Sequence, residues 1–370
     1  MSIRIRAAVA EAKAEPFQIQ EMELDEPRAD EVLVRVVACG VCQTDVHVWH
    51  QRLPTPLPIV LGHEGAGVVE RVGTAVTSLK PGDHVVLSFE ACGHCQPCLR
   101  AHSPYCDHQA EVNFSGHRLD GTIGIHRLAG SSGAPVRGHF FGQSSFASHA
   151  LTTERNTVKV PKDLPLELLA PLGCGLQTGA GAVLNSFRMT TGETLAIFGV
   201  GAVGLAAIMA GNAIAAGAII AVDINESRLT LAKELGATHT INPKEQDVGS
   251  ALRAITGRGV NFVFETSGRS EMLAHALQGL APLGQLGFVA PGPQSSVELL
   301  KMAPGASVRF IIQGDAVPQL FIPELIRLHK AGRFPFERLV RFYPFEQINE
   351  AFADSARGDV IKPVLRMGSY

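Results

Sequence analysis

The sequence predicts an α/β protein in which a doubly wound, six-stranded parallel sheet accompanies a second, β-rich part. Between residues 195 and 312, short apolar strands alternate with helical stretches, which is typical of a parallel sheet covered by helices on both faces. The first 150 residues are β-branched runs separated by turns, and mixed helix and strand return after about residue 315. This order predicts a domain inserted within another, with both chain ends in the β-rich part.

Composition limits the functions that are open to the chain. Its 370 residues suffice for two domains, and 46% hydrophobic with 18% charged residues can fill proper cores. The formal net charge of -3 provides no basic surface for nucleic acid or an anionic membrane. Seven cysteines, an odd number, and an N-terminal stretch interrupted by charges predict a cytoplasmic protein without disulfides. We expect its partners to be small molecules and copies of itself.

Three β-branched runs define the β-rich part. They are EVLVRVVA (31–38), GAGVVERV (65–72) and HVVLSF (84–89), and turn signals such as Pro81-Gly82-Asp83 separate them.

Six apolar segments predict the strands of the parallel sheet. They are LAIF (195–198), AIIAV (218–222), HTI (239–241), NFVFE (261–265), QLGFV (285–289) and VRFII (308–312). We expect Gly217 and Gly236 at the C-caps of the helices between them. The run 195–222 has a single polar side chain, Asn212, and is long enough to cross a bilayer. We interpret it as a buried strand, turn and helix because it is rich in Ala and Gly and contains GVGAVG.

A glycine-rich turn follows the first of these strands. Gly199, Gly201 and Gly204 form a GxGxxG pattern directly before a helical stretch. These glycines allow a tight turn and close approach of the backbone to a pyrophosphate at the helix N-terminus. Asp223 ends the next strand, where a carboxylate can accept hydrogen bonds from the adenine-ribose hydroxyls. The alternative is a turn that only packs a helix on the sheet, with Asp223 as a strand-end cap.

The same carboxylate predicts which dinucleotide binds. Because Asp223 would repel a 2′-phosphate, NAD is favoured over NADP. Arg228 on the following helix leaves room for NADP, and we count it among the candidate cofactor contacts, with a solvated helix position as the alternative.

Four cysteines gather in EACGHCQPCLRAHSPYC (90–106). Cys92, Cys95, Cys98 and Cys106 have the spacing C-x2-C-x2-C-x7-C. Four thiolates suit tetrahedral zinc and leave no position open for substrate, which predicts a structural zinc site. A [4Fe–4S] cluster is the alternative, although the bacterial ferredoxin run has a shorter last spacing followed by proline.

Catalytic chemistry is therefore expected at other residues. Cys42 in GVCQTDVH, His63 in LGHEGAG and Cys174 in PLGCGLQTG each stand in a glycine-containing turn. Two thiolates and one imidazole would bind zinc with a fourth position open to water or an alcohol. Taken singly, each could instead be a buried apolar cysteine or a satisfied loop histidine, since sequence does not show that they converge.

Together these motifs resemble the zinc-dependent medium-chain alcohol dehydrogenase family. GHEGAG, the four-cysteine stretch, GCGLQTGAGAV, GVGAVG and VDINESRLTLAKELGA occur in the family's order over essentially the whole chain. The resemblance implies a GroES-like catalytic domain over 1–174 and 315–370, with a structural zinc lobe at 90–107. A Rossmann NAD-binding domain would occupy 175–314. Two zinc ions per chain, NAD and a homotetramer or homodimer are implied as well.

The resemblance also implies roles for further residues. Thr44 matches the hydroxyl that contacts the alcohol, and His47 matches the histidine that releases its proton to solvent. Asp45 matches the carboxylate that orients the histidine ligand, and Glu64 matches an acidic residue beside the catalytic zinc. Among cofactor contacts the resemblance implies Thr178 and, at the pyrophosphate, Lys362.

Two longer stretches are similar to the aryl-alcohol branch of the family. They are LPLELLAPLGCGLQTGAGAVLNSF and FFGQSSFASHALTTERNTVKV. The similarity implies reversible oxidation of primary aromatic or allylic alcohols, such as benzyl alcohol or geraniol, to aldehydes. A glutathione-dependent formaldehyde dehydrogenase-like enzyme is one alternative, and a non-catalytic nucleotide-binding zinc protein is another. Ser88 stands where some relatives carry an aromatic residue, so the shape of the inner pocket stays open.

Overall fold

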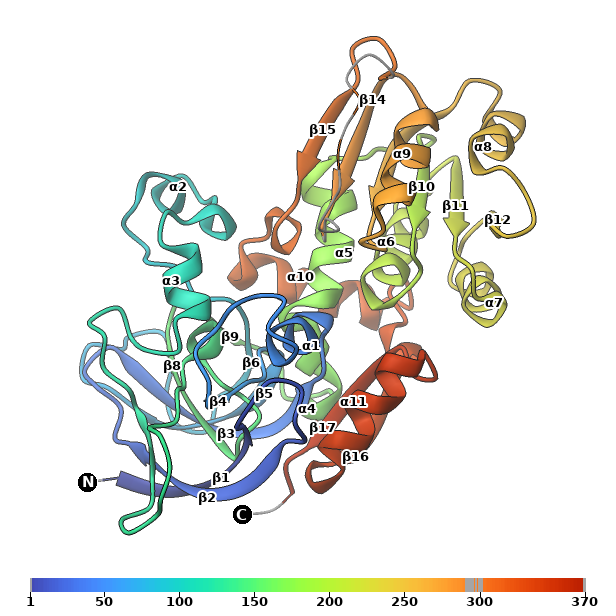
Figure 1. Cartoon of the computed structure of the whole chain (residues 1–370). Helices are drawn as coiled ribbons and strands as arrows, with labels where there is room; N and C mark the ends of the chain where they lie inside the picture. Colours follow the sequence, from blue (N-terminus) through green and yellow to red (C-terminus); the bar gives the residue numbers. More distant parts are fainter. Residues whose placement is uncertain (1, 290–295, 297, 299–301, 369–370) are drawn as a thin grey trace. The chain divides into compact units, whose positions relative to one another are not determined.

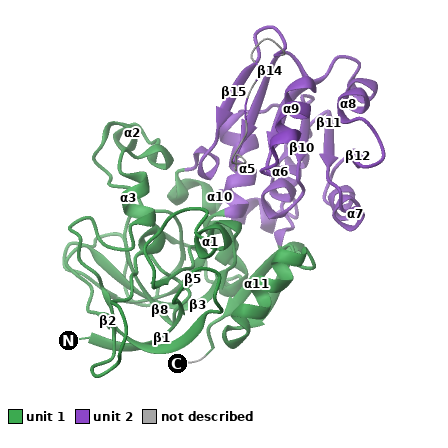
Figure 2. Ribbon diagram, in the orientation of Figure 1, with its two compact units in different colours: residues 1–174, 317–323, 337–370 green, residues 175–316, 324–336 purple. Residues whose placement is uncertain are grey.

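The computed structural model divides into two compact units, shown in different colours in Figure 2. The described residues are 2–289, 296, 298 and 302–368. Unit 1 comprises Met1–Cys174, Val317–Pro323 and Glu337–Tyr370, and unit 2 comprises Gly175–Ala316 and Glu324–Phe336. Residues 324–336 therefore group with unit 2, whereas the sequence analysis places them in the first domain.

Unit 1 is built on two mainly antiparallel sheets (Figure 1). Its strands are β1 (Ser2–Ala10), β2 (Gln18–Asp25), β3 (Glu31–Gly40), β4 (Ile59–Val60), β5 (Gly65–Val72), β6 (His84–Leu87), β7 (Ile125–Arg127), β8 (His149–Thr153), β9 (Thr157–Lys159), β16 (Val340–Pro344) and β17 (Lys362–Arg366). The smaller sheet has the order β4-β1-β2-β7, and the larger has the order β16-β17-β3-β5-β6-β9, with β8 paired to β3. The three strands predicted for this part are confirmed as β3, β5 and β6.

Strand β3 is the centre of unit 1. It pairs with β5, β8 and β17, and it is buried along most of its length, including Val32, Leu33 and Val34. Burial of both faces explains why its sequence is a nearly continuous apolar run and not an alternating one.

Short helices complete unit 1. They are α1 (Gln43–Trp49), α2 (Gln96–Leu99), α3 (Gln109–Phe114), α4 (Leu166–Leu169) and α11 (Ile348–Arg357), while α10 (Pro318–Lys330) crosses the boundary between the two groups of residues.

Unit 2 contains a six-stranded sheet in which every pairing is parallel. Its strands are β10 (Thr194–Phe198), β11 (Ala218–Val222), β12 (His239–Ile241), β13 (Val260–Glu265), β14 (Leu280–Phe288) and β15 (Ser307–Phe310). The spatial order β12-β11-β10-β13-β14-β15 places the first strand at the centre, where the winding direction reverses. The predicted doubly wound Rossmann sheet is confirmed.

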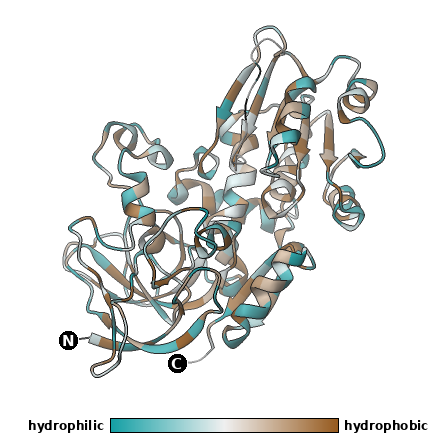
Figure 3. Ribbon diagram, viewed as in Figure 1, coloured by the Kyte–Doolittle hydropathy of each residue, from teal (hydrophilic) through white to brown (hydrophobic). Residues whose placement is uncertain are grey.

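Helix α5 (Gly175–Gly181) precedes the first of these strands. The helices between later strands are α6 (Ala202–Ala213), α7 (Glu226–Glu234), α8 (Val248–Thr256) and α9 (Ser270–Gln278). Leu252 of α8 and Leu273 of α9 pack with Ile220 and Val263 of the sheet in one buried cluster. Figure 3 shows the matching concentration of hydrophobic residues on the strands of unit 2.

The apolar run 195–222 folds as β10, the glycine turn, α6 and β11, as predicted. Within the described residues, no helix is both long and apolar enough to cross a membrane. Gly236 directly follows the C-cap residue of α7 and has a φ of +119°, which fits the prediction of a glycine at this helix end. The C-cap prediction for Gly217 is wrong. Helix α6 ends earlier, and Ala215 has the left-handed φ of +56°. Gly217 is needed because a Cβ there would lie 2.2 Å from the carbonyl oxygen of Gly192.

Candidate active site and metal centres

Unit 1 brings together four side chains that are far apart in the sequence. The ligand atoms of Cys42, His63, Glu64 and Cys174 all lie within 4.8 Å of one another. Cys42 is the N-cap of α1, His63 and Glu64 directly precede β5, and Cys174 follows the 3-10 turn at Ala170–Gly173. The fold therefore supplies the convergence that the sequence could not show.

The imidazole of His63 is oriented toward this group by a fully buried carboxylate. His63 Nδ1 lies 3.0 Å from Asp45 Oδ1, so in the neutral imidazole Nδ1 carries the proton and Nε2 is the nitrogen available to a metal ion. Among the described residues, Nε2 is buried without a hydrogen-bond partner. Leaving such an atom unsatisfied costs about 1–3 kcal/mol, and a metal ion at Nε2 would remove that cost. Together with two thiols, this donor set fits zinc.

Asp45 also fixes the backbone on both sides of the cluster. Its Oδ2 accepts a hydrogen bond from the N–H of Cys42 at 3.0 Å, which closes a capping box at the start of α1. Its Oδ1 accepts a second hydrogen bond from the N–H of Gly62 at 3.1 Å. One carboxylate thus holds Cys42, the turn before His63 and the imidazole itself.

The two thiols of the cluster have pKa values shifted in opposite directions. A hydrogen bond with Cys174 lowers the pKa of Cys42 well below its ordinary value, against the effect of burial, and His63 lowers it further. The same hydrogen bond and burial raise the pKa of Cys174. For His63, burial opposes the charged form, but Asp45 and Cys42 outweigh it and raise the pKa. Cys42 is therefore the thiol of the cluster that ionises more readily, and the thiolate is the form in which cysteine binds metal.

Glu64 has a partner that the sequence analysis did not predict. Both of its carboxylate oxygens lie 3.0 Å from Nζ of Lys362, and this ammonium also donates to the carbonyl oxygen of Val41 at 3.1 Å. Lys362 is only 2% exposed. Burial raises the pKa of Glu64 to about 7, against the attraction of Lys362. The structure thus gives Lys362 an internal partner, and its predicted pyrophosphate contact stays a prediction.

Gly40 makes room for this ion pair. A Cβ on Gly40 would lie 2.1 Å from a carboxylate oxygen of Glu64, so no larger residue fits there without moving the acid.

Thr44 and His47 lie on α1, three positions apart and therefore on one face of the helix. The hydroxyl oxygen of Thr44 lies 3.9 Å from the sulfur of Cys42. His47 is half-buried, and burial together with the nearby Arg52 lowers its pKa. The imidazole is consequently neutral at neutral pH and able to accept a proton.

The second cysteine group lies in a lobe of unit 1 around α2. The ligand atoms of Cys92, Cys95, Cys98 and Cys106 lie within 4.8 Å of one another. The sulfurs of Cys95 and Cys106 are 3.8 Å apart, and all seven cysteines of the chain are free, so no disulfide explains the group.

Backbone N–H groups point at the sulfurs of this lobe. The N–H of Cys92 and that of His108 donate to the sulfur of Cys106 at 3.3 and 3.4 Å, and the N–H of Cys95 donates to the sulfur of Cys92 at 3.4 Å. Such bonds stabilise thiolates, the form in which cysteine binds metal. The arrangement fits a closed, four-thiolate zinc site.

In unit 2, the glycine-rich turn between β10 and α6 leaves unfilled space beside one of its glycines. Gly199 has a φ of +85°, and a Cβ on Gly204 would lie 2.1 Å from the carbonyl oxygen of Gly199. A Cβ on Gly201, by contrast, would meet nothing within 4 Å. Gly199 and Gly204 are therefore required by the turn and the helix packing, whereas Gly201 leaves space that a pyrophosphate could occupy.

The remaining candidate cofactor residues also belong to unit 2. The carboxylate of Asp223 accepts hydrogen bonds from the N–H of Val200 at 2.8 Å and that of Asn225 at 2.9 Å. It thus closes the glycine turn and still has lone pairs for ribose hydroxyls. Thr178 is buried in α5, and Arg228 is half-buried on α7.

Two family models match the chain. The alcohol dehydrogenase GroES-like domain matches residues 28–162, and the zinc-binding dehydrogenase model matches residues 202–328. The chain belongs to the zinc-dependent medium-chain alcohol dehydrogenases. It is therefore an enzyme of this family, as the sequence motifs predicted.

Individual relatives of this alcohol dehydrogenase cover nearly its full length. Geraniol dehydrogenase of Castellaniella defragrans is 45% identical over 98% of each chain. Benzyl alcohol dehydrogenase of Acinetobacter calcoaceticus is 46% identical, with a TM-score of 0.94 and coverage of 99% of this chain and 100% of that one. An alcohol dehydrogenase zinc-binding domain protein from Burkholderia ambifaria is 52% identical, with a TM-score of 0.96 and full coverage of both chains.

Sequence reasoning missed Gln143, which braces the backbone around the cluster. Its buried amide donates to the carbonyl oxygens of His63 at 3.1 Å and Ser88 at 2.8 Å, and it accepts from the N–H of Gly65 at 3.2 Å. The hydroxyl of Ser88 in turn donates to the carbonyl oxygen of Gly173 at 2.7 Å. No motif marks Gln143, because its role depends on segments that meet only in the fold.

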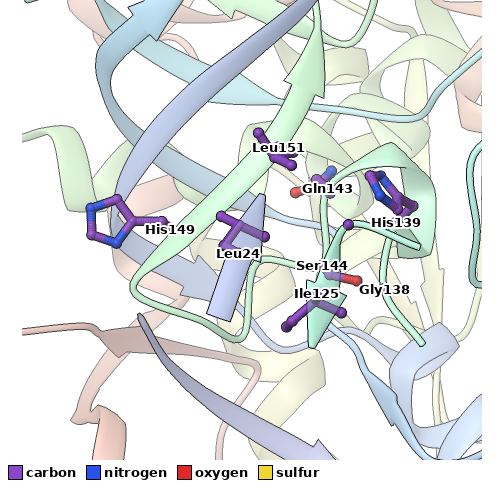
Figure 4. A pocket seen from close by; sticks show the side chains of 9 residues that line it. Leu24, Ile125, Gly138, His139, Gln143, Ser144, His149 and Leu151 are labelled. Atoms are coloured by element: carbon purple, nitrogen blue, oxygen red, sulfur yellow. The ribbon is translucent and has the colours of Figure 1, made fainter. Parts of the chain in front are cut away.

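A small pocket beside Gln143 is separate from the cluster (Figure 4). None of the four cluster residues lines it. Its lining consists of Leu24, Gly124, Ile125, Gly138, His139, Gln143, Ser144, His149 and Leu151.

We expect Asp45→Asn to weaken zinc binding at the Cys42–His63–Cys174 cluster by about 10- to 100-fold. An amide cannot accept from both His63 Nδ1 and the N–H of Cys42, because one of its two ends is itself a donor. Zinc retained per chain during equilibrium titration with a chelator measures the effect. Asp83→Asn is the matched control, since Asp83 is also a buried carboxylate that accepts a backbone N–H in unit 1. Equal retention in the two variants would contradict this role of Asp45.

Proposed function

We propose that this protein catalyses the reversible oxidation of primary aromatic or allylic alcohols to aldehydes, with hydride transfer to NAD. In each turnover the alcohol loses one proton to solvent and one hydride to the oxidised cofactor. The observation that carries the proposal is the cluster of two thiols and one oriented, buried imidazole, in a chain of the alcohol dehydrogenase family.

In this proposal Cys42, His63 and Cys174 hold the catalytic zinc, and Glu64 stands beside it in its ion pair with Lys362. When bound, zinc supplies a Lewis acid that favours ionisation of the alcohol hydroxyl. Cys92, Cys95, Cys98 and Cys106 hold a second zinc that stabilises the lobe and leaves no position for substrate.

Thr44 and His47 provide the proposed route for the proton. The Thr44 hydroxyl lies beside the sulfur of Cys42 and can accept a proton from the alcohol while passing its own onward. His47, neutral because its pKa is lowered, is a base on the same helix face with access to solvent. Asp45 affects Thr44 and His47 only by fixing the start of α1, so it is a positioning residue.

The aromatic or allylic substrate class is supported by the relatives. Benzyl alcohol dehydrogenase and geraniol dehydrogenase share 46% and 45% identity with this chain along almost its entire length. Both names describe alcohols whose aldehydes are conjugated, and conjugation favours the product side of the oxidation.

NAD is proposed as the cofactor because the Rossmann sheet has an open glycine position and a carboxylate at the end of β11. Gly201, Asp223 and Arg228 would bind its pyrophosphate and adenine ribose, and Thr178 is a further proposed contact. We further propose a cytoplasmic homo-oligomer. Strand β15 ends the described sheet and exposes Phe310, and the neighbouring strand β14 exposes Leu283.

The substrate class is tested by comparing kcat/KM for benzyl alcohol and ethanol with NAD. We expect benzyl alcohol to be preferred by at least about tenfold, since burial of the ring stabilises its transition state. Equal values, or a preference for ethanol, would discard the aromatic and allylic class but keep the alcohol dehydrogenase. A requirement for glutathione would indicate the formaldehyde dehydrogenase-like alternative.

His47→Gln should slow alcohol oxidation mainly at low pH. The lowered pKa of His47 keeps its imidazole neutral at neutral pH, so the imidazole can accept the proton of the alcohol when hydroxide is scarce. Glutamine has no basic nitrogen that could accept this proton. We expect kcat to fall by about tenfold below neutral pH and to approach the wild-type value at high pH. Zinc content should not change. A pH–rate profile equal to that of the wild type would exclude the proposed relay.

Gly201→Ala should raise the Kd for NAD without destabilising the fold. The added methyl group meets no protein atom within 4 Å, so it can only occupy the space proposed for the pyrophosphate. We expect an increase of about tenfold, which corresponds to about 1.4 kcal/mol. Gly249→Ala in α8 is the control, since its Cβ would meet only ordinary contacts starting at 3.6 Å. Unchanged NAD binding in Gly201→Ala, measured by titration calorimetry, would refute the pyrophosphate site.

A further inference from the structure

A third group of metal-binding side chains adjoins the four-cysteine lobe. The sulfur of Cys92 and one ring nitrogen each of His94 and His108 lie within 4.8 Å of one another. Cys92 belongs to both this group and the four-cysteine group. The two sets of ligands are therefore joined at one sulfur.

The hydrogen bonds of the two histidines leave each ring with a free lone pair. His94 Nδ1 lies 2.9 Å from the carbonyl oxygen of Cys92, and His108 Nδ1 lies 3.2 Å from a carboxylate oxygen of Glu111. Both oxygens can only accept, so both Nδ1 atoms carry the proton and both Nε2 atoms are bases. A histidine backed by a carboxylate or a carbonyl is the arrangement commonly found behind metal ligands.

The two groups differ in their access to solvent. His94 and His108 are exposed, the side chain of His108 by 45%, whereas Cys92 and Cys106 are only 6% and 4% exposed. The ring centroids of the two histidines are 6.0 Å apart. Cys95 and Cys98 are half-buried. The imidazoles are therefore more accessible to an ion from solvent than the sulfur of Cys92, with which they form the group.

We propose that His94, His108 and Cys92 form a loading site through which a divalent transition-metal ion enters the four-cysteine lobe. The inference rests on the proposed structural zinc site. The imidazoles capture the ion together with Cys92, and Cys95, Cys98 and Cys106 then replace them one at a time. Each thiol that binds loses its proton to solvent, each displaced imidazole leaves as the same neutral ring that was bound, and no electrons are exchanged. Cys92 stays bound throughout.

The difference in affinity between the two groups favours transfer to the four-cysteine group. Four thiolates bind a soft or borderline cation more strongly than two imidazoles and one thiolate. After the transfer the two histidines no longer bind the ion and keep only their hydrogen bonds to oxygen. They therefore affect the rate at which metal is loaded but not the final metal occupancy of the four-cysteine group.

The experiment follows the exchange of Cd²⁺ into the intact zinc-loaded protein. Cd²⁺ favours thiolates, and its thiolate-to-metal absorption is strongest for a site with four of them, which distinguishes the lobe from the Cys42–His63–Cys174 cluster. The His94→Gln/His108→Gln double variant is compared with the wild type. His102→Gln is the matched control, because His102 is exposed in the same lobe and lies outside the group. Exchange at the Cys42–His63–Cys174 cluster provides an internal reference.

We expect the four-thiolate phase to be slower by about tenfold or more in the double variant, with the same final absorption. The His102→Gln protein and the internal reference should exchange at wild-type rates. Equal four-thiolate rates in the double variant and the wild type would overturn the loading site. A wild-type protein without any four-thiolate signal would overturn the structural zinc site as well, so the two failures can be told apart.

Discussion

The proposed catalytic cluster depends on one buried carboxylate. Asp45 accepts hydrogen bonds from the N–H of Cys42, the N–H of Gly62 and Nδ1 of His63, and no part of its side chain reaches solvent. An ionised group at such depth is tolerated only where donors surround it. Because Asp45 also completes the capping box of α1, the interaction that starts the helix is the one that aims the imidazole. Helix formation and metal-site geometry are thereby coupled in one side chain.

The two cysteine-containing groups are held in contrasting ways. The cluster of Cys42, His63 and Cys174 is assembled from distant segments of unit 1 and braced by Asp45 and Gln143. The four-cysteine lobe is local in sequence, and its buried cluster consists of Ala91, Cys92 and Cys106 with the two other cysteines packed against it. So small an apolar cluster contributes little stability, and a bound metal would supply most of what orders the lobe. The first group is thus prepared by the fold, whereas the second depends on its ion.

Sequence patterns predicted the elements that depend on local chemistry. The strands at 65–72 and 218–222 match the structure because apolar β-branched runs ended by turn residues have few other solutions. The C-cap at Gly217 failed because that glycine serves a close backbone approach, which involves a residue distant from the helix end. Gln143 and the Lys362–Glu64 ion pair were missed for the same reason, since their partners lie 80 and 298 positions away in the sequence. The convergence of Cys42, His63 and Cys174 was expected only through the family resemblance.

Metal analysis combined with zinc X-ray absorption tests most directly whether this chain holds two zinc ions in different surroundings. We expect two zinc ions per chain, one for each of the two cysteine-containing groups. The averaged spectrum should show mostly sulfur ligands, with a minority of nitrogen or oxygen contributed by His63 and an exchangeable ligand. One zinc ion per chain with only sulfur ligands would mean that the Cys42–His63–Cys174 cluster does not hold a metal, and the proposed mechanism would then be wrong.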